Sequence, residues 1–131
     1  MTGVSDLGSV KALVFDVFGT VVDWRTSLIA DFTWWARGRG IKADWTALVD
    51  GWRGMYVASM DEVRKHPERG YVILDVLHRR SLEKLVEKFA IAGLTEADLD
   101  YLTKGWHRLN PWPDSVAGLT RLKTKFVIAP L

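Results

Sequence analysis

The residues best suited to chemistry stand close together, in the segment Leu13-Val-Phe-Asp16-Val-Phe18-Gly19-Thr20. Asp16 follows a short apolar run, and a carboxylate at the C-terminal end of a parallel strand lies where α/β folds bind ligands. Gly19 allows a sharp turn, and the Thr20 hydroxyl can donate a hydrogen bond that aims one carboxylate oxygen at a substrate. Aspartate is ionised at neutral pH and can attack a substrate covalently. On spacing alone, however, an aspartate that only ends a strand and caps a turn is the commoner case.

The elements around Asp16 alternate between strand and helix. Short runs that are apolar on both faces predict buried parallel strands at 11–16 and 125–131. Helical spacing of apolar residues, with caps and breaks, predicts four helices between them, at 23–37, 45–63, 71–89 and 95–107. Thr95 and Asp98 form a capping-box pair at the start of the fourth helix. A two-proline connector, 110–114, precedes a helix with Val116, Leu119 and Leu122 inward.

Composition sets the class of protein. The chain has 131 residues, 48% hydrophobic and 26% charged, which is typical of one globular domain. No apolar run approaches the roughly 20 residues of a membrane span, and the first nine residues hold no secretory signal. A net charge of +2 without a dense basic stripe argues against nucleic-acid binding. Cysteine is absent, so disulfides and thiolate metal sites are excluded and a cytoplasmic location is expected.

The pattern as a whole, a hydrophobic strand, Asp16, Phe18, Gly19-Thr20, two apolar residues and Asp23, resembles motif I of the haloacid dehalogenase-like superfamily. It is similar above all to the metal-independent type II 2-haloacid dehalogenases. Asn110-Pro-Trp-Pro-Asp114, followed by Gly118-Leu119 and Leu122-Lys123, resembles that family's return from cap to core. The resemblance implies an α/β fold: a Rossmann-like core with a parallel sheet and an inserted four-helix cap. Residues 1–22 and 110–131 then belong to the core, with its first two strands, and residues 23–109 form the cap.

Position 18 separates two branches of this superfamily. Its phosphatases and phosphotransferases read Asp-x-Asp, where the second aspartate protonates the leaving oxygen. This chain has Phe18 there, which cannot donate a proton. A halide leaves without protonation, so an apolar residue fits carbon–halogen cleavage. Phe18 also fits ordinary packing at the floor of a pocket, and the two roles are compatible.

Arg53, in Trp52-Arg53, is the second position that the resemblance identifies. It is similar to the cap arginine of the dehalogenases, which faces the nucleophile and accepts the departing halide. A guanidinium suits that role because its charge is permanent and its donors are fixed. A solvated helix arginine is the usual alternative. Phe18, Trp52, Tyr56 and Leu74 are predicted to contact the substrate. Packing on a helix face explains Tyr56 and Leu74 equally well, and Trp52 also belongs to the buried stripe of its helix.

The remaining candidates are structural. Asp23 and Trp24 close the motif, and His66, His78 and His107 are isolated surface or packing residues without metal-ligand spacing. No metal ligands and no cofactor are therefore predicted. Asp16, Thr20 and Arg53 are the predicted catalytic residues.

The resemblance implies hydrolysis of short 2-haloalkanoic acids to 2-hydroxy acids through an ester on Asp16, and it leaves defluorination of fluoroacetate open. It implies a small-molecule haloacid and halide as ligands, no nucleic-acid or membrane partner, and allows a homodimer. Two alternatives remain: a Mg²⁺-dependent phosphatase of the same superfamily, against which Phe18 argues, and a non-catalytic interaction protein with the same fold.

The last strand ends without a following turn, and two parallel strands cannot bury their faces alone. The family's Ser-Asn pair, lysine and late acidic motif would follow it. We therefore expect that the sequence is cut inside an α/β domain, and that residues 1–131 alone are inactive.

Overall fold

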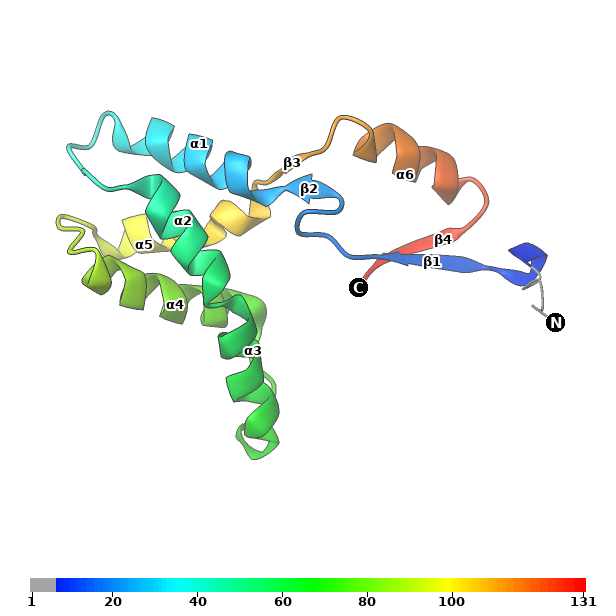
Figure 1. The fold of residues 1–131 in the computed structure, drawn as a ribbon, viewed down its shortest axis with the longest axis horizontal. Helices are drawn as coiled ribbons and strands as arrows, with labels where there is room; N and C mark the ends of the chain where they lie inside the picture. The colour runs from blue at the N-terminus through cyan, green and yellow to red at the C-terminus, as the bar shows by residue number, and fades with distance from the viewer. Residues whose placement is uncertain (1–6) are drawn as a thin grey trace. The chain divides into compact units, whose positions relative to one another are not determined.

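The computed structural model describes residues 7–131, which divide into two compact units (Figure 1). The sheet unit contains the residues up to Trp24 together with Leu109–Leu131, and the helical unit contains Arg25–Arg108. The helical unit is thus an insertion between two segments of the sheet unit.

Two parallel strands carry the sheet unit. Strand β1 (Ala12–Phe15) pairs with β4 (Val127–Pro130), so that Ala12 lies opposite Val127 and Phe15 opposite Pro130. Helix α6 (Ser115–Lys123) leads into β4, and a 3-10 turn, Leu7–Ser9, precedes β1. The predicted parallel pair is confirmed, and the structure shows α/β architecture.

A second, very short ladder joins the two segments of the sheet unit. Strand β2 (Val22–Asp23) pairs antiparallel with β3 (Asn110–Pro111). The sequence did not predict these strands, because two residues are too few to show a period. The ladder nevertheless matters for the site, since it holds the segment after Asp16 against the proline-rich connector.

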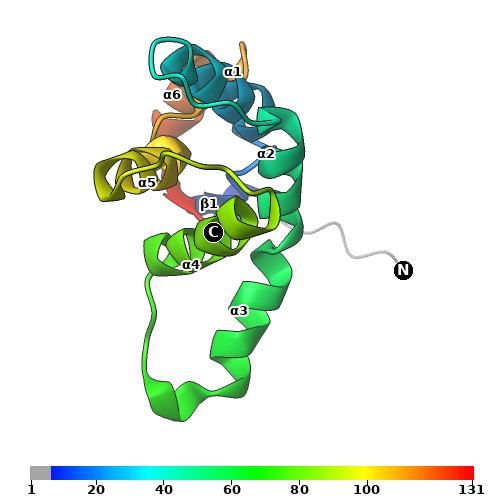
Figure 2. The ribbon, with the colours of Figure 1, turned by 90° about the vertical axis from the view of Figure 1, so that its left-hand side faces the viewer.

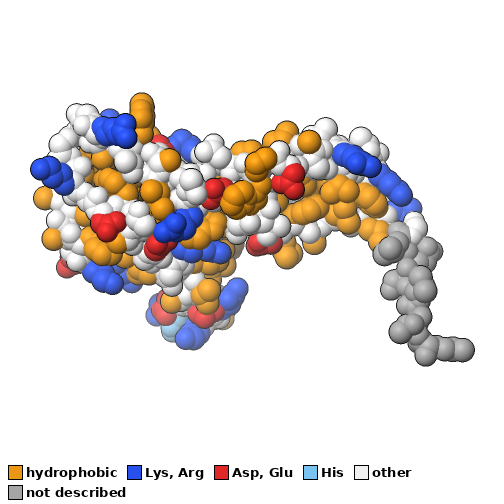
Figure 3. Space-filling model, turned by 45° about the horizontal axis from the view of Figure 1, so that its top comes forward, with side chains coloured by type: hydrophobic (Ala, Val, Ile, Leu, Met, Phe, Trp, Pro, Cys, Tyr) orange, Lys and Arg blue, Asp and Glu red, His pale blue; other side chains and the backbone are white. Residues whose placement is uncertain are grey.

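The strands of the sheet unit are less buried than the sequence predicts. None of residues 8–24 and 109–131 is buried, and Val14 and Val127 are 61% and 66% exposed. Val116, predicted to face inward on α6, is 64% exposed, whereas Leu119 and Leu122 are half-buried. Figure 3 shows apolar side chains spread over the face of this unit that it presents. One helix against two strands covers too little surface to bury them, so the prediction of buried strands is wrong for this unit.

The helical unit contains the core. Its helices, with the 3-10 turns that follow α3 and α5, are α1 (Trp24–Ala36), α2 (Trp45–Gly54), α3 (Tyr56–Lys65), η2 (Pro67–Arg69), α4 (Leu74–Lys88), α5 (Glu96–Thr103) and η3 (Lys104–His107). Each of α1, α2, α4 and α5 turns an apolar stripe inward, and Leu28, Phe32, Leu48, Trp52, Leu82 and Leu102 are at most 1% exposed. Figure 2 shows α3 and η2 extending away from these four helices before the chain returns to α4.

Most of the differences from the predicted helices lie at ends and breaks. The single helix predicted for 45–63 is two helices, α2 and α3, which separate at Met55. Gly51 and Gly54 lie just before the break and weaken the helix there. The helix predicted to start at Tyr71 starts at Leu74, because Ile73 is extended. The last one ends as α5 and continues as η3.

The capping box at the start of α5 is confirmed. Thr95 Oγ1 accepts a hydrogen bond from the Asp98 backbone N–H (3.2 Å), and the Asp98 carboxylate accepts one from the Thr95 N–H (2.9 Å). The bond from the Thr95 N–H to the carboxylate, and a second one donated by the Thr95 hydroxyl (2.8 Å), hold the pKa of Asp98 below its usual value. Within residues 7–131, no helix has both the length and the apolar character needed to cross a membrane.

Candidate active site

Asp16 lies directly after β1, at the C-terminal end of a strand in the parallel pair. The Thr20 hydroxyl donates a hydrogen bond of 2.8 Å to Asp16 Oδ2, which is the bond that the sequence predicts. Both residues are exposed. The bond fixes one carboxylate oxygen, so the carboxylate is oriented while its other oxygen can approach a ligand.

The turn between Asp16 and Thr20 has a defined backbone. Gly19 has φ of +97°, a conformation that L side chains rarely adopt, and its N–H donates to the Val22 carbonyl at 2.9 Å. The Val21 N–H donates in turn to the Val17 carbonyl at 3.0 Å. A glycine is therefore required at this position for Thr20 to reach back to the carboxylate.

Trp112 of the connector and Ser115 at the start of α6 both donate hydrogen bonds to this turn. The sequence did not identify them as part of the site. Trp112 Nε1 donates to the Gly19 carbonyl (2.9 Å), and Ser115 Oγ donates to the Val21 carbonyl (2.6 Å). Their only sequence signal is a place in or just after a rigid Pro-Trp-Pro segment, which shows rigidity but not contacts. They tie the turn that carries Thr20 to the start of α6.

Phe18 stands two residues after Asp16 and is half-buried, with a backbone bridge to Val22. Its side chain is apolar and has no proton to donate. A reaction at Asp16 therefore receives no general acid from the position next but one to it.

A small hollow of about 160 Å³ lies beside Thr20 in the sheet unit. It is lined by Phe15, Thr20, Val21 and residues of α6 and its N-terminus: Asp114, Ser115, Gly118, Leu119 and Leu122. Thr20 thus joins the carboxylate on one side to a partly apolar hollow on the other.

Arg53 lies in the last turn of α2, in the helical unit. It is half-buried, its Nη1 atom is buried, and its guanidinium carbon lies 4.5 Å from the centre of the Tyr56 ring. This is a cation–π contact, which attracts the guanidinium to the face of the ring. Arg53 is therefore not a fully solvated arginine on the outer face of a helix, which was the alternative interpretation of the sequence.

The other predicted contact residues of the helical unit differ in burial. Trp52 is 1% exposed and packs within the core, whereas Tyr56 and Leu74 are half-buried on α3 and at the start of α4. The structure groups Asp16, Phe18 and Thr20 in the sheet unit and brings Arg53 and Tyr56 into contact in the helical unit. The substrate contacts of Trp52, Tyr56 and Leu74 stay predictions.

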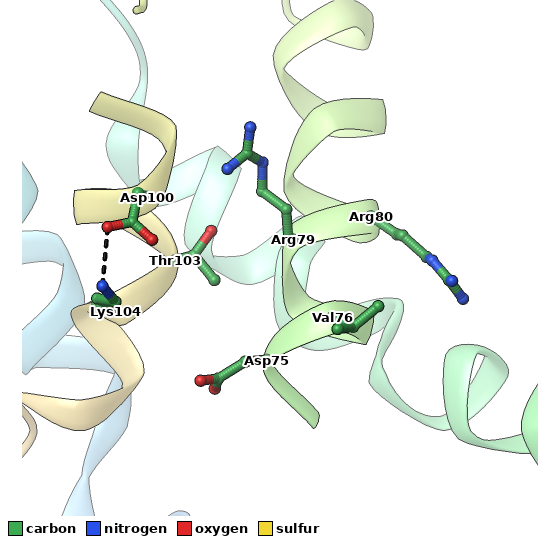
Figure 4. Close-up of a pocket in the computed structure, with 7 residues that line it drawn as sticks. All are labelled: Asp75, Val76, Arg79, Arg80, Asp100, Thr103 and Lys104. Carbon is green, nitrogen blue, oxygen red and sulfur yellow. Dashed lines mark hydrogen bonds and ion pairs between the residues drawn. The ribbon is translucent and has the colours of Figure 1, made fainter. Parts of the chain in front are cut away.

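Another cavity, of about 220 Å³, lies between α4 and α5 and contains none of the predicted site residues (Figure 4). Four of its five charged lining residues have ion-pair partners: Lys104 pairs with Asp100 at 2.9 Å, Asp75 with His107 at 2.8 Å, and Arg79 with Glu83 and Glu96. Partial burial lowers the pKa of Arg79, but the hydrogen bonds that Arg79 donates to Glu83 and Glu96 outweigh this effect, so its pKa is raised. The pairs of Arg79 with Glu96 and of Asp75 with His107 join α4 to α5 and η3.

No protein-family model and no curated protein matches the chain. Several solved structures do. An L-2-haloacid dehalogenase is 45% identical with a TM-score of 0.85, over 93% of this chain and 52% of that one. A defluorinating L-2-haloacid dehalogenase is 40% identical with a TM-score of 0.81, over 92% and 50%. The L-2-haloacid dehalogenase from Xanthobacter autotrophicus is 25% identical with a TM-score of 0.68, over 93% and 46%.

The strand that ends in Asp16, the inserted helical unit and these likenesses define the class: the chain has the fold of the haloacid dehalogenase-like superfamily. Within that superfamily it is similar to the L-2-haloacid dehalogenases. It spans about half the length of those structures.

Proposed function

We propose that the protein hydrolyses short 2-haloalkanoic acids to 2-hydroxy acids through an ester on Asp16. The observation that carries the proposal is the held carboxylate of Asp16, with Thr20 on Oδ2 at 2.8 Å and Phe18 at the place of a general acid. The similarity to two L-2-haloacid dehalogenases, at 45% and 40% identity, supports the same chemistry.

The first step is a displacement at carbon. An oxygen of the Asp16 carboxylate attacks C2 of the haloacid from the side opposite the halogen, forming a C–O bond. The C–X bond breaks, and its electron pair leaves with the halide. No proton is needed, so Phe18 is compatible with this step and unsuited to the release of a phosphate ester's alcohol.

The departing halide needs a positive charge, and Arg53 is the residue that we propose for it. Its guanidinium carries a permanent charge, and its central carbon lies over the Tyr56 ring, 4.5 Å from the ring centre. Charge stabilisation of this kind is commonly the largest contribution to catalysis when the donors are fixed in advance. Arg53 would thus stabilise charge on the halogen as the C–X bond lengthens.

The second step regenerates the enzyme. Water attacks the carboxyl carbon of the Asp16 ester, the ester C–O bond breaks, and the product leaves with the oxygen that Asp16 contributed. One oxygen of water then remains in the Asp16 carboxylate, and one proton is released. We assign the activation of this water to no residue of this chain.

The halogen range is part of the proposal. One similar structure is of a defluorinating L-2-haloacid dehalogenase, and we propose fluoroacetate as a substrate alongside chlorinated acids. We also propose that residues 1–22 and 110–131 belong to the core and residues 23–109 to the cap. We further propose that the protein acts in the cytoplasm and forms a homodimer. The absence of cysteine in the sequence supports a reducing compartment.

A single turnover in heavy-oxygen water tests the proposal. The natural full-length protein is incubated with a molar excess of enzyme over L-2-chloropropionate, with chelator present, and its peptides are weighed. We expect chloride release and one heavy oxygen in the peptide that carries Asp16. Asp16→Asn, which keeps the shape of the side chain, is the matched control and should take no label. Chloride release with the label in the 2-hydroxy acid instead would show direct attack by water and refute the ester.

A further inference from the structure

His78 is a buried titratable residue that the proposed reaction does not use. It lies on α4 and is 4% exposed. Helices α2 and α3, which carry Arg53 and Tyr56, both pack against α4 (Figure 2). The other buried residues of α4 are leucines and Ser81, so His78 is the only buried ring on this helix. Its place close to Arg53 and Tyr56 therefore needs a physical explanation.

Four flat groups follow one another in a column, which we call the Arg53 column: Arg53, Tyr56, His78 and Trp106. The guanidinium carbon of Arg53 lies 4.5 Å from the Tyr56 ring centre. The Tyr56 and His78 rings are 6.2 Å apart and tilted by 39°, and the His78 and Trp106 rings stack at 4.6 Å and 19°. The column joins α2, α3, α4 and η3, so the orientation of the guanidinium depends on rings from three other elements.

The column is fixed at its inner end. Trp52 Nε1 donates a hydrogen bond of 3.0 Å to the backbone carbonyl of His78. The Trp52 ring also packs edge-on against Trp106, with ring centres 5.6 Å apart. Trp52 precedes Arg53 in α2, so the same turn of helix that carries Arg53 holds the backbone under the imidazole ring.

The charge state of His78 suits a ring that supports an arginine. The pKa of His78 is lowered to about 4, mainly by burial; Asp75 opposes this shift, whereas Arg53 and His107 add to it. These are the charged groups that face it from α2, η3 and its own helix. The ring is therefore neutral near pH 7, and it adds no second positive charge behind Tyr56.

We infer that His78 is a positioning residue that holds the Arg53 guanidinium in place through Tyr56. The inference rests on the proposed function for its catalytic consequence, because a fixed guanidinium is what a departing halide requires. Its structural content, the dependence of Arg53 on His78, stands apart from any activity. The required property is a flat, uncharged ring between Tyr56 and Trp106.

Nuclear magnetic resonance tests the structural content in the natural full-length protein. The measured quantity is the order parameter of the Arg53 Nε–H bond, assigned by its loss in Arg53→Lys. A rigid group gives about 0.85 and a flexible one less than about 0.6. We expect the high value in the wild type and in His78→Phe, which keeps a flat neutral ring, and the low value in His78→Ala. His107→Gln, which alters the exposed histidine beside Asp75, is the matched control and should change nothing.

Turnover then tests the consequence. Halide release by His78→Ala should fall about tenfold in kcat with little change in KM, and His78→Phe should restore it. In an Arg53→Ala background the same loss of the ring should cost less than twofold, because coupled residues are not additive. An unchanged Arg53 order parameter in a folded His78→Ala protein overturns the inference, and so does a full tenfold loss in the Arg53→Ala background. A wild type that releases no halide refutes the proposed function instead, and the order parameter still decides whether His78 holds Arg53.

Discussion

Acidification should destabilise the protein through His78. Burial lowers the pKa of this ring to about 4 in the folded state, whereas an unfolded chain gives about 6.5. Between about pH 4 and about pH 6.5, His78 is mostly protonated in the unfolded chain and mostly neutral in the folded chain. The free energy of unfolding therefore falls as the pH drops from about 6.5 to about 4. Above the unfolded-state pKa of about 6.5, the neutral His78 contributes its full share of the stability.

The magnitude follows from the width of that interval. A difference of about 2.5 pH units at 1.36 kcal/mol per unit corresponds to a loss of about 3 kcal/mol by pH 4. That is a large fraction of the roughly 5–15 kcal/mol that stabilise a typical domain. His78 is 4% exposed, so solvent screens its charge little.

Urea unfolding of the full-length protein, followed by tryptophan fluorescence at a series of pH values from 7 to 4, measures this loss. Other groups titrate over the same range, so the informative quantity is the difference between wild type and His78→Phe. We expect this difference to change by about 3 kcal/mol across the series, in the direction that favours the variant at low pH. Parallel stability curves for wild type and His78→Phe would refute the reasoning.

Two substitutions test packing and orientation. Gly105→Ala would place a Cβ 2.8 Å from two carbons of the buried Phe32 ring, and we expect urea unfolding to show a loss of about 1–3 kcal/mol; Gly118→Ala, with nothing within 4 Å, is the matched helical control and should not destabilise. Thr20→Val removes the hydrogen bond to Asp16 while keeping the shape, and we expect kcat for halide release to fall about tenfold, with Thr20→Ser close to wild type. Equal activity of the valine and serine variants would show that the hydroxyl does not orient the carboxylate.

Features that depend on neighbours in the sequence could be predicted. The bond from Thr20 to Asp16 spans four residues across a glycine turn, and the capping box at Thr95 and Asp98 spans three. The parallel pairing of the two apolar runs followed from their composition. Each of these rests on local residue types, which the sequence displays directly.

Features that depend on surroundings could not be predicted. Helical spacing predicts that Val116 faces inward, but Val116 is 64% exposed because few elements cover this unit. The break at Met55 interrupts an apolar stripe that is continuous in the sequence. Gly51 approaches Leu85 so closely that a Cβ there would lie 3.2 Å from the leucine Cδ2, so helix-to-helix contact selects this glycine.

His78 shows the same limit at the candidate site. An isolated histidine in a helical stripe predicts a surface or packing residue, and the structure confirms that it packs. Its relation to Arg53 passes through Tyr56, which lies on another helix, so no spacing in the sequence expresses it.

Phe18 and Arg53 both bear on which leaving group the proposed site can release. A leaving oxygen needs a proton, which requires a carboxyl group near the nucleophile, whereas a leaving halide needs a positive charge that does not move. The first group is missing at position 18, where the side chain is an apolar ring. The second is present as a guanidinium held on Tyr56 at the end of a buried aromatic column. A cation that must stay charged gains from a neutral support, because a protonated imidazole behind Tyr56 would repel it. The low pKa of His78 and the absence of an acid at position 18 are therefore both consistent with the proposed release of a halide anion.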